Sequence, residues 1–514
     1  MISHIVIFPV ILPLLTGIVL LLLPGQQWSL KRITSFTSLC FQIAIAVFLL
    51  ITVSNGDILA YALGNWSPPF GIVLVADRLA AWMLIVTVLV ATCALLYAIR
   101  GTDKNGAHFH TLFQLQLFGL NGAFLTGDLF NLFVFFEILL LASYSLLLHG
   151  GGRLKTKAGL HFVIINLVGS TLFLFAVGIL YGLLGTLNMA DLALKIVSTP
   201  EENVALIHVA GLLLFAVFAL KAALLPLYLW LPAAYAHTTA TVAALFAIMT
   251  KVGAYSILRV YTLIFGAQAG HLANLIENWL LPLALLTLIV GVLGALASTR
   301  LRQQVAYLVI ASIGTLLTAF GMHTQAGIAA GLFYLPHSTF AAAALFLLTD
   351  CIANRRNVMD DQFEPGPIIQ QQRLIGILFF ILAILIAGLP PLSGFIGKFL
   401  ILQAALTHSA LPWIMGVILI TSLFTLIALA RGGSMLFYRA QAPHICNIDP
   451  NADVQRNSLS VAMELTSVIC LLMLCIGLMV WAGVITEYTT ATANQLLQPE
   501  FYIQSVLNME VIQQ

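Results

Sequence analysis

The sequence predicts an all-α polytopic membrane protein, and three observations support this prediction. The chain has 514 residues, of which 61% are hydrophobic and only 8% are charged. Soluble domains carry about 25% charged residues, so this chain has too few polar side chains to cover a surface in water. Many apolar runs are close to the roughly 20 residues that an α-helix needs to cross a bilayer. The short alternating segments of a transmembrane β-barrel are absent from the sequence.

The apolar runs predict about fourteen transmembrane helices. Their approximate ranges are 4–24, 33–53, 76–99, 109–126, 129–148, 160–184, 205–227, 236–264, 277–298, 303–321, 325–349, 373–403, 411–434 and 461–485. The first run lacks a basic flank and a cleavage signal, which favours a retained span over a signal peptide.

Basic residues in the loops test this count and predict the orientation. Fifteen of the 21 Lys and Arg residues lie in or beside the odd-numbered loops. These are Lys31, Arg32, Arg100, Lys104, Arg153, Lys155, Lys157, Arg300, Arg302, Arg355, Arg356, Arg373, Arg431, Arg439 and Arg456. The positive-inside rule then places the odd loops in the cytoplasm and both termini on the outer side.

Four charged residues fall well inside predicted spans: Glu137, Lys221, Lys251 and Lys398. A charge at the bilayer centre costs roughly 2.5–3.5 kcal/mol on insertion scales, so such residues usually face a bundle interior or a watery cavity. Burial makes a lysine easier to deprotonate and a glutamate easier to protonate, so the group can pass protons. The alternative is structural pairing, or a lysine near a span end that reaches the interface. Glu464 lies near the start of its span and is expected to reach the interface.

Prolines interrupt the segments around two of these lysines. Two prolines follow the lysine in L-K-A-A-L-L-P-L-Y-L-W-L-P (220–232), and two precede it in G-L-P-P-L-S-G-F-I-G-K (388–398). Proline breaks or kinks a helix, and broken backbone at membrane depth is tolerated only where protein or water satisfies it. One interrupted segment in each half predicts internal repeats with ion sites near mid-membrane. The alternative is a pair of ordinary proline kinks.

Two histidines lie in or beside apolar spans, and histidine shuttles protons well near neutral pH. His337 is a candidate relay residue and His237 a secondary candidate, although a lone membrane histidine can also simply bond a neighbouring helix. The six cysteines form no C-x-x-C pair, and neither a G-x-G-x-x-G nor a Walker A motif is present. The sequence therefore predicts no cofactor and no metal site. A formal charge of +2 favours no nucleic-acid partner.

Several of these motifs together resemble a known family. They are G-D-L-F-N-L-F-V-F-F-E-I-L-L-L-A-S-Y (127–144), L-K-A-A-L-L-P-L-Y-L-W-L-P-A-A-Y-A-H (220–237), M-T-K-V-G-A-Y-S-I-L-R-V (249–260) and G-L-P-P-L-S-G-F-I-G-K-F (388–399). The chain is similar to the antiporter-like membrane subunits of complex I and of Mrp cation/proton antiporters. Within this family it most resembles the D subunits of the Mrp (Mnh/Pha) type.

The resemblance implies two inverted five-helix repeats whose broken helices are the seventh and the twelfth. It implies a Glu137–Lys221 pair in the first half, Lys251 as a bridge, His337 as a relay and Lys398 as the terminal lysine. Asp128, in the first motif, is a further secondary candidate. The expected division is 1–105 for helices 1–3, 106–275 and 276–440 for the two repeats, and 441–514 for a loop, the last helix and the tail.

The resemblance also implies partners and a location. The expected partners are other membrane subunits of a hetero-oligomeric antiporter, with protons and Na⁺ or K⁺ as the transported ions, in a bacterial inner membrane. Two positions depart from the family pattern. Thr238-Thr239 stands where relatives often have a proline, and Ala342 where many carry a second lysine. The second half is therefore expected to depend on His337 and water.

Three functions are compatible with these residues. The first is a proton-conducting subunit of a cation/proton antiporter, which is a transporter and not an enzyme. The second is the related proton-pumping subunit of a complex I-like or hydrogenase-like redox complex. The third is a structural assembly subunit whose buried charges have no transport role. A single-subunit solute carrier is a weaker fourth alternative.

Overall fold

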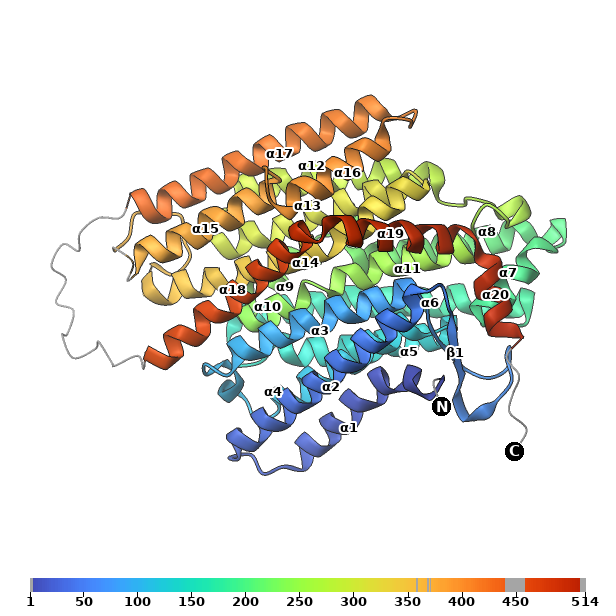
Figure 1. The fold of residues 1–514 in the computed structure, drawn as a ribbon, viewed down its shortest axis with the longest axis horizontal. Helices are drawn as coiled ribbons and strands as arrows, with labels where there is room; N and C mark the ends of the chain where they lie inside the picture. Colours follow the sequence, from blue (N-terminus) through green and yellow to red (C-terminus); the bar gives the residue numbers. More distant parts are fainter. Residues whose placement is uncertain (1–2, 357–358, 368, 370, 440–457, 509–514) are drawn as a thin grey trace.

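The computed structural model describes residues 3–356, 359–367, 369, 371–439 and 458–508 (Figure 1). Arg456, assigned above to the thirteenth loop, lies outside the described residues, as does part of the predicted 441–514 unit. The described chain is almost entirely helical, as the apolar composition predicts.

The elements follow one another along the chain with short connections. In the first half they are α1 (Phe8–Leu22), α2 (Trp28–Ser54), β1 (Leu59–Ala62), β2 (Val73–Ala76), α3 (Arg78–Ala98), α4 (Phe109–Leu125), α5 (Leu129–Leu147), α6 (Arg153–Leu184), α7 (Met189–Val197), α8 (Glu201–Ala222), α9 (Trp230–His237), α10 (Ala240–Phe246) and α11 (Met249–Leu263). In the second half they are α12 (Glu277–Ala297), α13 (Leu301–Gly321), α14 (Gln325–Arg356), α15 (Gln372–Ala387), α16 (Ser393–Ala405), α17 (Leu411–Gly433), α18 (Ser458–Val480), α19 (Ala482–Leu497) and α20 (Pro499–Leu507). Single 3-10 or π turns flank some of these helices.

A helix or a pair of helices occupies each of the fourteen predicted ranges. Within the described residues, 11 helices are long and apolar enough to cross a membrane, or up to 12 if a bent pair counts as one span. The bent pair, 464–480 with 482–497, turns by 78°. α4 has only 17 residues, and α15 and α16 are separated by a break. The chain is a multi-pass membrane protein, but the count of fourteen spans is not confirmed.

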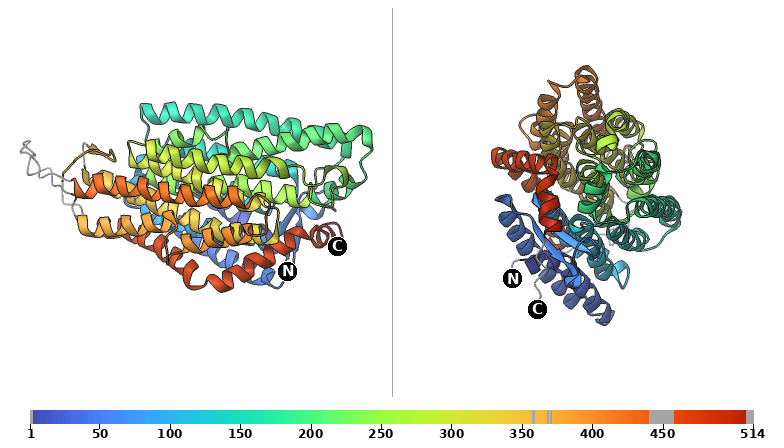
Figure 2. Two further views of the ribbon diagram at one scale, coloured as in Figure 1. Left: turned by 90° about the horizontal axis from the view of Figure 1, so that it is seen from above. Right: turned by 90° about the vertical axis from the view of Figure 1, so that its right-hand side faces the viewer.

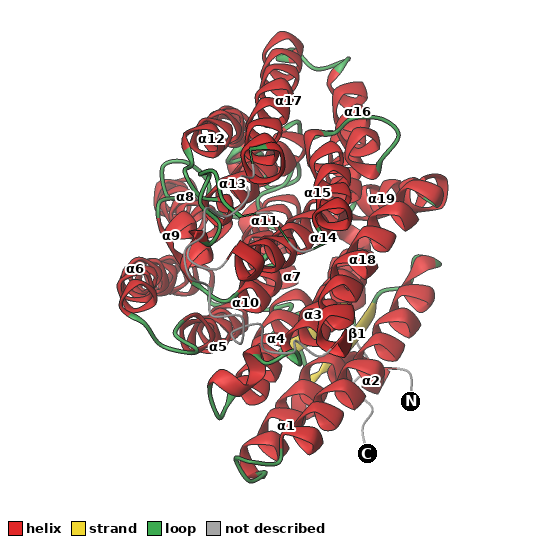
Figure 3. Ribbon diagram, turned by 90° about the vertical axis from the view of Figure 1, so that its left-hand side faces the viewer, coloured by secondary structure: helices red, strands yellow, loops and turns green. Residues whose placement is uncertain are grey.

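The spans lie side by side along the long axis of the molecule (Figure 1). Seen end-on, α10, α11 and α14 lie in the middle, whereas α1, α6 and α17 lie at the periphery (Figure 3). The central spans 240–263 and 325–356 are fully buried in their most apolar windows. The peripheral span 411–438 is only 33% buried, so its apolar side chains face outward, as lipid-facing side chains do.

The two ends of the bundle differ. At one end Arg100 and Arg302 both pair with Asp350, and Arg153 lines a cavity together with Arg302. We call this the basic end. The start of the described chain, the antiparallel β1–β2 hairpin and α20 lie at the other end (Figure 1). The hairpin, in which Leu59 pairs with Ala76, is a small strand element that the sequence analysis did not predict.

The C-terminal helices cover one side of the bundle. α18 and α19 pass between the N-terminal helices and α16, and both pack on α14 (Figure 2). α14 is therefore enclosed from Gly327 to Thr349, because α10 and α13 pack on its other sides. This enclosure places His337, which lies near the middle of α14, deep inside the protein.

Candidate functional site: a line of buried charged residues

Lys221 lies inside the bundle at the end of α8, with 8% of its side chain exposed. Its Nζ donates to Asn166 Oδ1 on α6 at 3.1 Å and lies 6.0 Å from the ring centroid of Phe136. Ser170, one turn further along α6, donates its hydroxyl to the Glu137 carboxylate. Among the described ion pairs none joins Glu137 to Lys221 within 4 Å, although the Glu137 charge acts on the lysine. α6 thus holds both groups apart on neutral partners.

The helix carrying Lys221 ends one residue later. Ala223 has a left-handed φ of 60°, and the chain turns through Leu224–Leu229 before α9 begins. The break leaves backbone groups to satisfy inside the membrane. Trp230 Nε1 donates to the Leu220 carbonyl at 3.0 Å, and Thr287 Oγ1 accepts from Leu225 N at 2.9 Å. The prolines thus coincide with a real helix break at the lysine, as predicted.

Lys251 lies on α11, beside this break. α11 can approach closely because a side chain at Gly253 would lie 2.3 Å from the backbone nitrogen of Ala222. The lysine is fully buried, and its Nζ has no hydrogen-bond partner among the described residues. Its charge acts on His337 of α14. Lys251 is therefore adjacent to both halves, which is the position that the resemblance implies for a bridge.

His337 is 2% exposed, and its Nδ1 lies 3.0 Å from the Ser393 hydroxyl at the start of α16. The charge of Lys398 also acts on this imidazole. Beside the ring is a cavity of about 20 Å³ that Ala342 helps to line. About 10–15 Å³ is enough for one water, so the position where many relatives carry a lysine borders a water-sized space.

Lys398 lies on α16, just after the second helix break, and is half-buried. Its Nζ donates to the carbonyls of Ile386 at 3.4 Å and Ala387 at 3.0 Å, and to Ser422 Oγ at 2.9 Å. The carbonyls belong to the end of α15, where Gly388 has a φ of 79° and leaves room for the lysine stem. The amine therefore turns into the bundle, so the alternative of a lysine that reaches the interface does not fit this geometry.

Two small neighbouring cavities border His337 and Lys398. The cavity at His337 and a second one of about 30 Å³ at Lys398 share four lining residues. These are Leu308, Ser312, Tyr334 and Ile386. Each has room for about one or two waters, and Ser312 and Tyr334 supply hydroxyls to bond them. The second half thus has space for water near both His337 and Lys398.

The two secondary candidates lie elsewhere. His237 is the last residue of α9 and lines a cavity of about 730 Å³ at the basic end. Asp128 caps the N-terminus of α5, where its side chain accepts from Asn131 N at 2.8 Å. Burial raises the pKa of Asp128 to about 6. Its geometry is that of a helix cap, so Asp128 does not join the line of buried charges.

Sequence reasoning missed the polar partners of these charges: Asn166, Ser170, Ser393 and Ser422. Asn166 and Ser170 are polar residues four positions apart in the apolar run of α6, a spacing that places both on one helix face. That spacing could have identified them. Ser393 lies alone in its segment, whereas Ser422 lies between Thr421 and Thr425, a spacing that could also have identified it.

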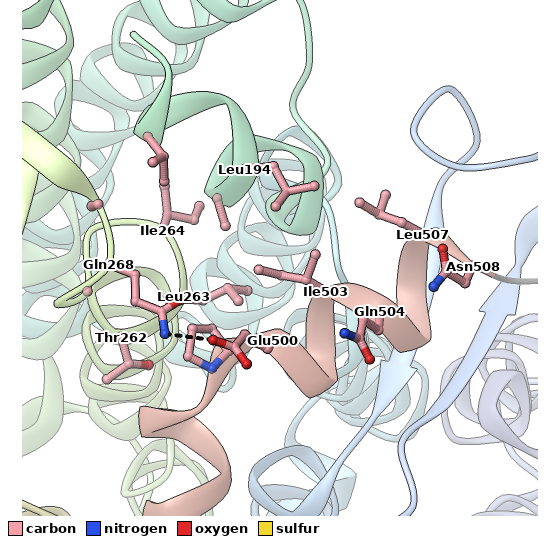
Figure 4. Close-up of a pocket in the computed structure, with 15 residues that line it drawn as sticks. Leu194, Thr262, Leu263, Ile264, Gln268, Glu500, Ile503, Gln504, Leu507 and Asn508 are labelled. Atoms are coloured by element: carbon pink, nitrogen blue, oxygen red, sulfur yellow. Dashed lines mark hydrogen bonds between the residues drawn. The ribbon is translucent and has the colours of Figure 1, made fainter.

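Another cavity, of about 300 Å³, lies at the end opposite to the basic end (Figure 4). It is enclosed by α7, the end of α11 and α20, and its lining is mainly apolar. Gln268 Nε2 donates to Glu500 Oε1 at 3.1 Å across its edge. None of the buried lysines lines it, so it does not belong to the line of charges. No group of three metal-binding side chains occurs among the described residues.

Comparisons with known proteins agree with this architecture. A family model described as "NADH:quinone oxidoreductase/Mrp antiporter, TM" matches residues 126–425. The chain is 40% identical to the D subunit of a probable K⁺/H⁺ antiporter of Rhizobium meliloti, over 98% of each chain. It is 37% identical to the D subunit of a Na⁺/H⁺ antiporter of Alkalihalophilus pseudofirmus, over 98% of this chain and 99% of the relative.

Comparisons with solved structures also match the chain to membrane subunits over nearly its full length. A chain of the Mrp complex from Dietzia sp. superposes with a TM-score of 0.86 at 28% identity, covering 98% of this chain and 99% of that one. A chain of the archaeal membrane-bound sulfane sulfur reductase has the same fold, with a TM-score of 0.85 at 23% identity over 98% and 99%. From the family match over residues 126–425 and the full-length relatives, the chain belongs to the family of NADH:quinone oxidoreductase and Mrp antiporter membrane subunits.

Proposed function

We propose that this chain is a proton-translocating subunit of a multisubunit Na⁺/H⁺ or K⁺/H⁺ antiporter, and a transporter rather than an enzyme. The observation that carries the proposal is the line of buried lysines, in which Lys221 and Lys398 each lie at a helix break and Lys251 lies between them. A buried lysine with neutral partners loses its proton more readily than one in water. The names of the full-length relatives support the antiporter assignment.

Protons pass from Lys221 to Lys251, then through His337 to Lys398. Glu137 favours the protonated form of Lys221, and its own contact with Ser170 sets how strongly it does so. Lys251 has no hydrogen-bond partner among the described residues that would retain its proton. The small cavities between His337 and Lys398 support water-mediated transfer in the second half. In this scheme 106–275 and 276–440 act as the two repeats, each with one broken helix.

The basic end faces the cytoplasm in this proposal, and both termini face the outer side of a bacterial inner membrane. The excess of Lys and Arg in the loops at that end supports this orientation. The partners are the other membrane subunits of the antiporter. The many apolar side chains on the surface of α6 and α17 offer faces for such subunits or for lipid.

The second candidate function is a proton-pumping subunit of a redox complex. It is supported by the fold shared with the membrane-bound sulfane sulfur reductase and by the family description, which includes NADH:quinone oxidoreductase. Copurification distinguishes the two. Purification with other small antiporter subunits supports the first function, whereas purification with quinone- or electron-handling subunits supports the second.

The test is cation-driven proton transport in inverted vesicles that contain the complete complex, with assembly checked on a native gel. Lys221→Ala is expected to abolish transport and to leave assembly intact. The matched control is Lys195→Ala, which removes a lysine that is 41% exposed and pairs with Asp191 four residues earlier. Wild-type transport by an assembled Lys221→Ala complex would reject the proposal and favour a structural assembly subunit.

A further inference from the structure

Four buried threonine hydroxyls precede Lys251 in the sequence, and we call them the threonine row. The hydroxyls of Thr238, Thr239, Thr241 and Thr250, and then Nζ of Lys251, have no hydrogen-bond partner among the described residues. Thr238, Thr241 and Thr250 are 5%, 1% and 0% exposed. Buried polar groups are nearly always hydrogen-bonded in proteins, through water where no protein partner exists. Five unpaired atoms within fourteen residues therefore indicate a hydrated segment.

Threonines in other helices of the bundle behave differently. A membrane threonine normally donates to the carbonyl four residues before it, as Thr87, Thr318 and Thr349 do at 2.7–2.8 Å. For Thr250 the corresponding acceptor is the carbonyl of Phe246, and Tyr235 donates its hydroxyl to that oxygen at 2.6 Å. Tyr235 thus occupies the usual acceptor of Thr250.

The remaining hydroxyls are unpaired because the helix is interrupted. α9 ends at His237, and Thr238 and Thr239 lie in the extended link before α10, so their hydroxyls have no helical turn to donate into. Thr241 lies in the first turn of α10. The departure from the family pattern at Thr238-Thr239 therefore adds two hydroxyls at a backbone break.

A large cavity begins where this row begins. The cavity of about 730 Å³ at the basic end lies between the starts of α6 and α13 and the end of α9, and His237 lines it. Asp361 Oδ1 and Arg302 Nε, from two other lining residues, are also buried without hydrogen-bond partners among the described residues. Polar atoms without such partners thus occur both in the lining of this cavity and along the threonine row.

We propose that this cavity and the threonine row form a proton entrance from the basic end directly to Lys251. The inference rests on the proposed function and adds to it, because Lys251 then takes up protons at the middle of the line. His237 accepts a proton in the cavity. Each hydroxyl then accepts a proton from the group before it and donates its own to the next, until the lone pair of neutral Lys251 takes the last one.

Water must complete this path in one section. Thr241 and Thr250 are nine residues apart, and at 1.5 Å per residue the helical rise between them is about 14 Å. Hydroxyls hold the water at both ends of this section. A Thr→Val substitution keeps the shape of the side chain and removes the hydroxyl, whereas Thr→Ser keeps the hydroxyl and removes a methyl group.

The experiment compares Thr241→Val and Thr250→Val with the corresponding serine variants, in inverted vesicles that contain the complete complex. The valine variants are expected to lower cation-driven proton transport about tenfold or more, and the serine variants to stay within about twofold of wild type. Thr318→Val is the matched control, since Thr318 is fully buried but donates to the Gly314 carbonyl at 2.8 Å. Wild-type transport by both valine variants, or equal loss with serine and valine, would overturn the entrance.

Failure of the proposed function is distinguishable in the same series. Loss of transport in Lys221→Ala with wild-type transport in the valine variants rejects the entrance alone. Loss in the valine variants with wild-type transport in Lys221→Ala rejects the proposed relay order and keeps the entrance.

A second measurement tests the entrance even if a valine variant does not assemble. Thr241→Cys is expected to react with a small, membrane-impermeant thiol reagent added from the basic end, and Thr318→Cys to stay unreacted. Equal protection of both thiols would overturn the entrance.

Discussion

At the scale of single residues, the environment of Lys221 explains how a lysine can be retained in an apolar run. Its amine has one neutral partner, Asn166, and a carboxylate that acts on it without direct contact. A directly paired buried lysine would hold its proton strongly, because a charged partner stabilises the protonated form. A buried lysine without any polar partner would lose its proton more readily. The environment of Lys221 lies between these two cases, so its amine can both bind and release a proton, as a proton carrier must.

Asn166→Asp tests this balance. The substitution keeps the size of the side chain and places a carboxylate about where Oδ1 now lies, 3.1 Å from Lys221 Nζ. Hydrogen bonds to charged groups contribute about 1.5–3 kcal/mol, against about 0.5–1.5 for neutral ones. The proton is therefore held more strongly, and since about 1.4 kcal/mol is a factor of ten, transport is expected to fall about tenfold. The measurement is cation-driven proton transport in vesicles.

The control for this variant is Asn494→Asp, which adds the same charge on an exposed position of α19. It should transport like wild type. Unchanged transport in an assembled Asn166→Asp complex would show that Asn166 does not set the proton affinity of Lys221.

Asp128 gives a pH-dependent prediction outside the spans. Burial raises its pKa from 3.8 to about 6, while backbone hydrogen bonds at the α5 cap oppose this shift. Because the folded-state pKa is raised, the stabilisation from this group is complete below about pH 4 and is lost as pH rises through 6. Asp128→Asn keeps the capping oxygen and never ionises. At pH 8 the variant is expected to be more stable than wild type, by up to about 3 kcal/mol for two pKa units.

The measurement for Asp128→Asn is thermal unfolding of the purified complex at pH 4 and pH 8. The difference between variant and wild type should be small at pH 4 and large at pH 8. The same difference at both pH values would mean that the Asp128 carboxyl does not titrate in this range.

The sequence identified the charged residues of the site but not their partners. Glu137, Lys221, Lys251 and Lys398 are recognisable because each is costly in an apolar run. Asn166 and Ser422 are mildly polar, and such residues are common in membrane helices. Their contacts join residues 55 and 24 positions apart, and such pairings depend on how helices pack. The structure adds that Ser170 binds the Glu137 carboxylate and that Asn166 binds Lys221, so no described ion pair joins the two charged groups directly.

At the scale of helices, a buried ion pair fixes the position of α11. Arg259, two turns after Lys251, donates to both carboxylate oxygens of Asp77 at 2.6 and 2.7 Å. Asp77 also caps α3 by accepting from Ala80 N at 2.9 Å. Both side chains are at most 5% exposed. The pair thus sets the depth of α11, and with it the depth of Lys251.

Arg259→Leu is expected to destabilise the protein by about 3–5 kcal/mol, because it leaves a buried carboxylate without a positively charged partner. Adding Asp77→Asn should recover most of this loss, since the capping oxygen remains and the unpaired charge is removed. The measurement is the melting temperature of the purified complex, with assembly followed on a native gel. Equal destabilisation of the single and double variants would contradict the assignment of the loss to an unpaired charge.

The helix breaks were predictable from the sequence, whereas the number of spans was less so. Proline lacks the backbone N–H that a helix needs, so the breaks near residues 226 and 390 follow from local chemistry. The span count depends on lengths that tertiary packing decides. α4 is apolar but ends after 17 residues, and the last span bends by 78° between Val480 and Ala482. No proline occurs in the sequence of this bend, so the hydropathy pattern does not predict it.

At the scale of the whole molecule, one carboxylate joins the C-terminal helices to the core. Glu464, near the start of α18, is 1% exposed and lies beside arginines of the basic end. It pairs with Arg100 beyond the end of α3 at 2.5 Å and with Arg355 at the end of α14 at 2.9 Å. The three segments lie far apart in sequence, so hydropathy alone could not reveal the contact. α14 carries His337, so this contact also supports the candidate site.

Glu464→Gln is expected to destabilise the protein by about 3 kcal/mol, because Arg355 is then buried without a negative partner. The loss of stability should be confined to the helices that Glu464 joins. Backbone amides of α18 and of the end of α14 should exchange hydrogen for deuterium faster, while those of α5, which does not contact this ion pair, keep their wild-type rates. Asp191→Asn is the matched control, since it removes a partly exposed pair that contributes at most about 1 kcal/mol. Uniformly faster exchange in all helices would instead indicate general unfolding, and unchanged exchange in α18 would show that Glu464 does not hold the C-terminal helices on the bundle.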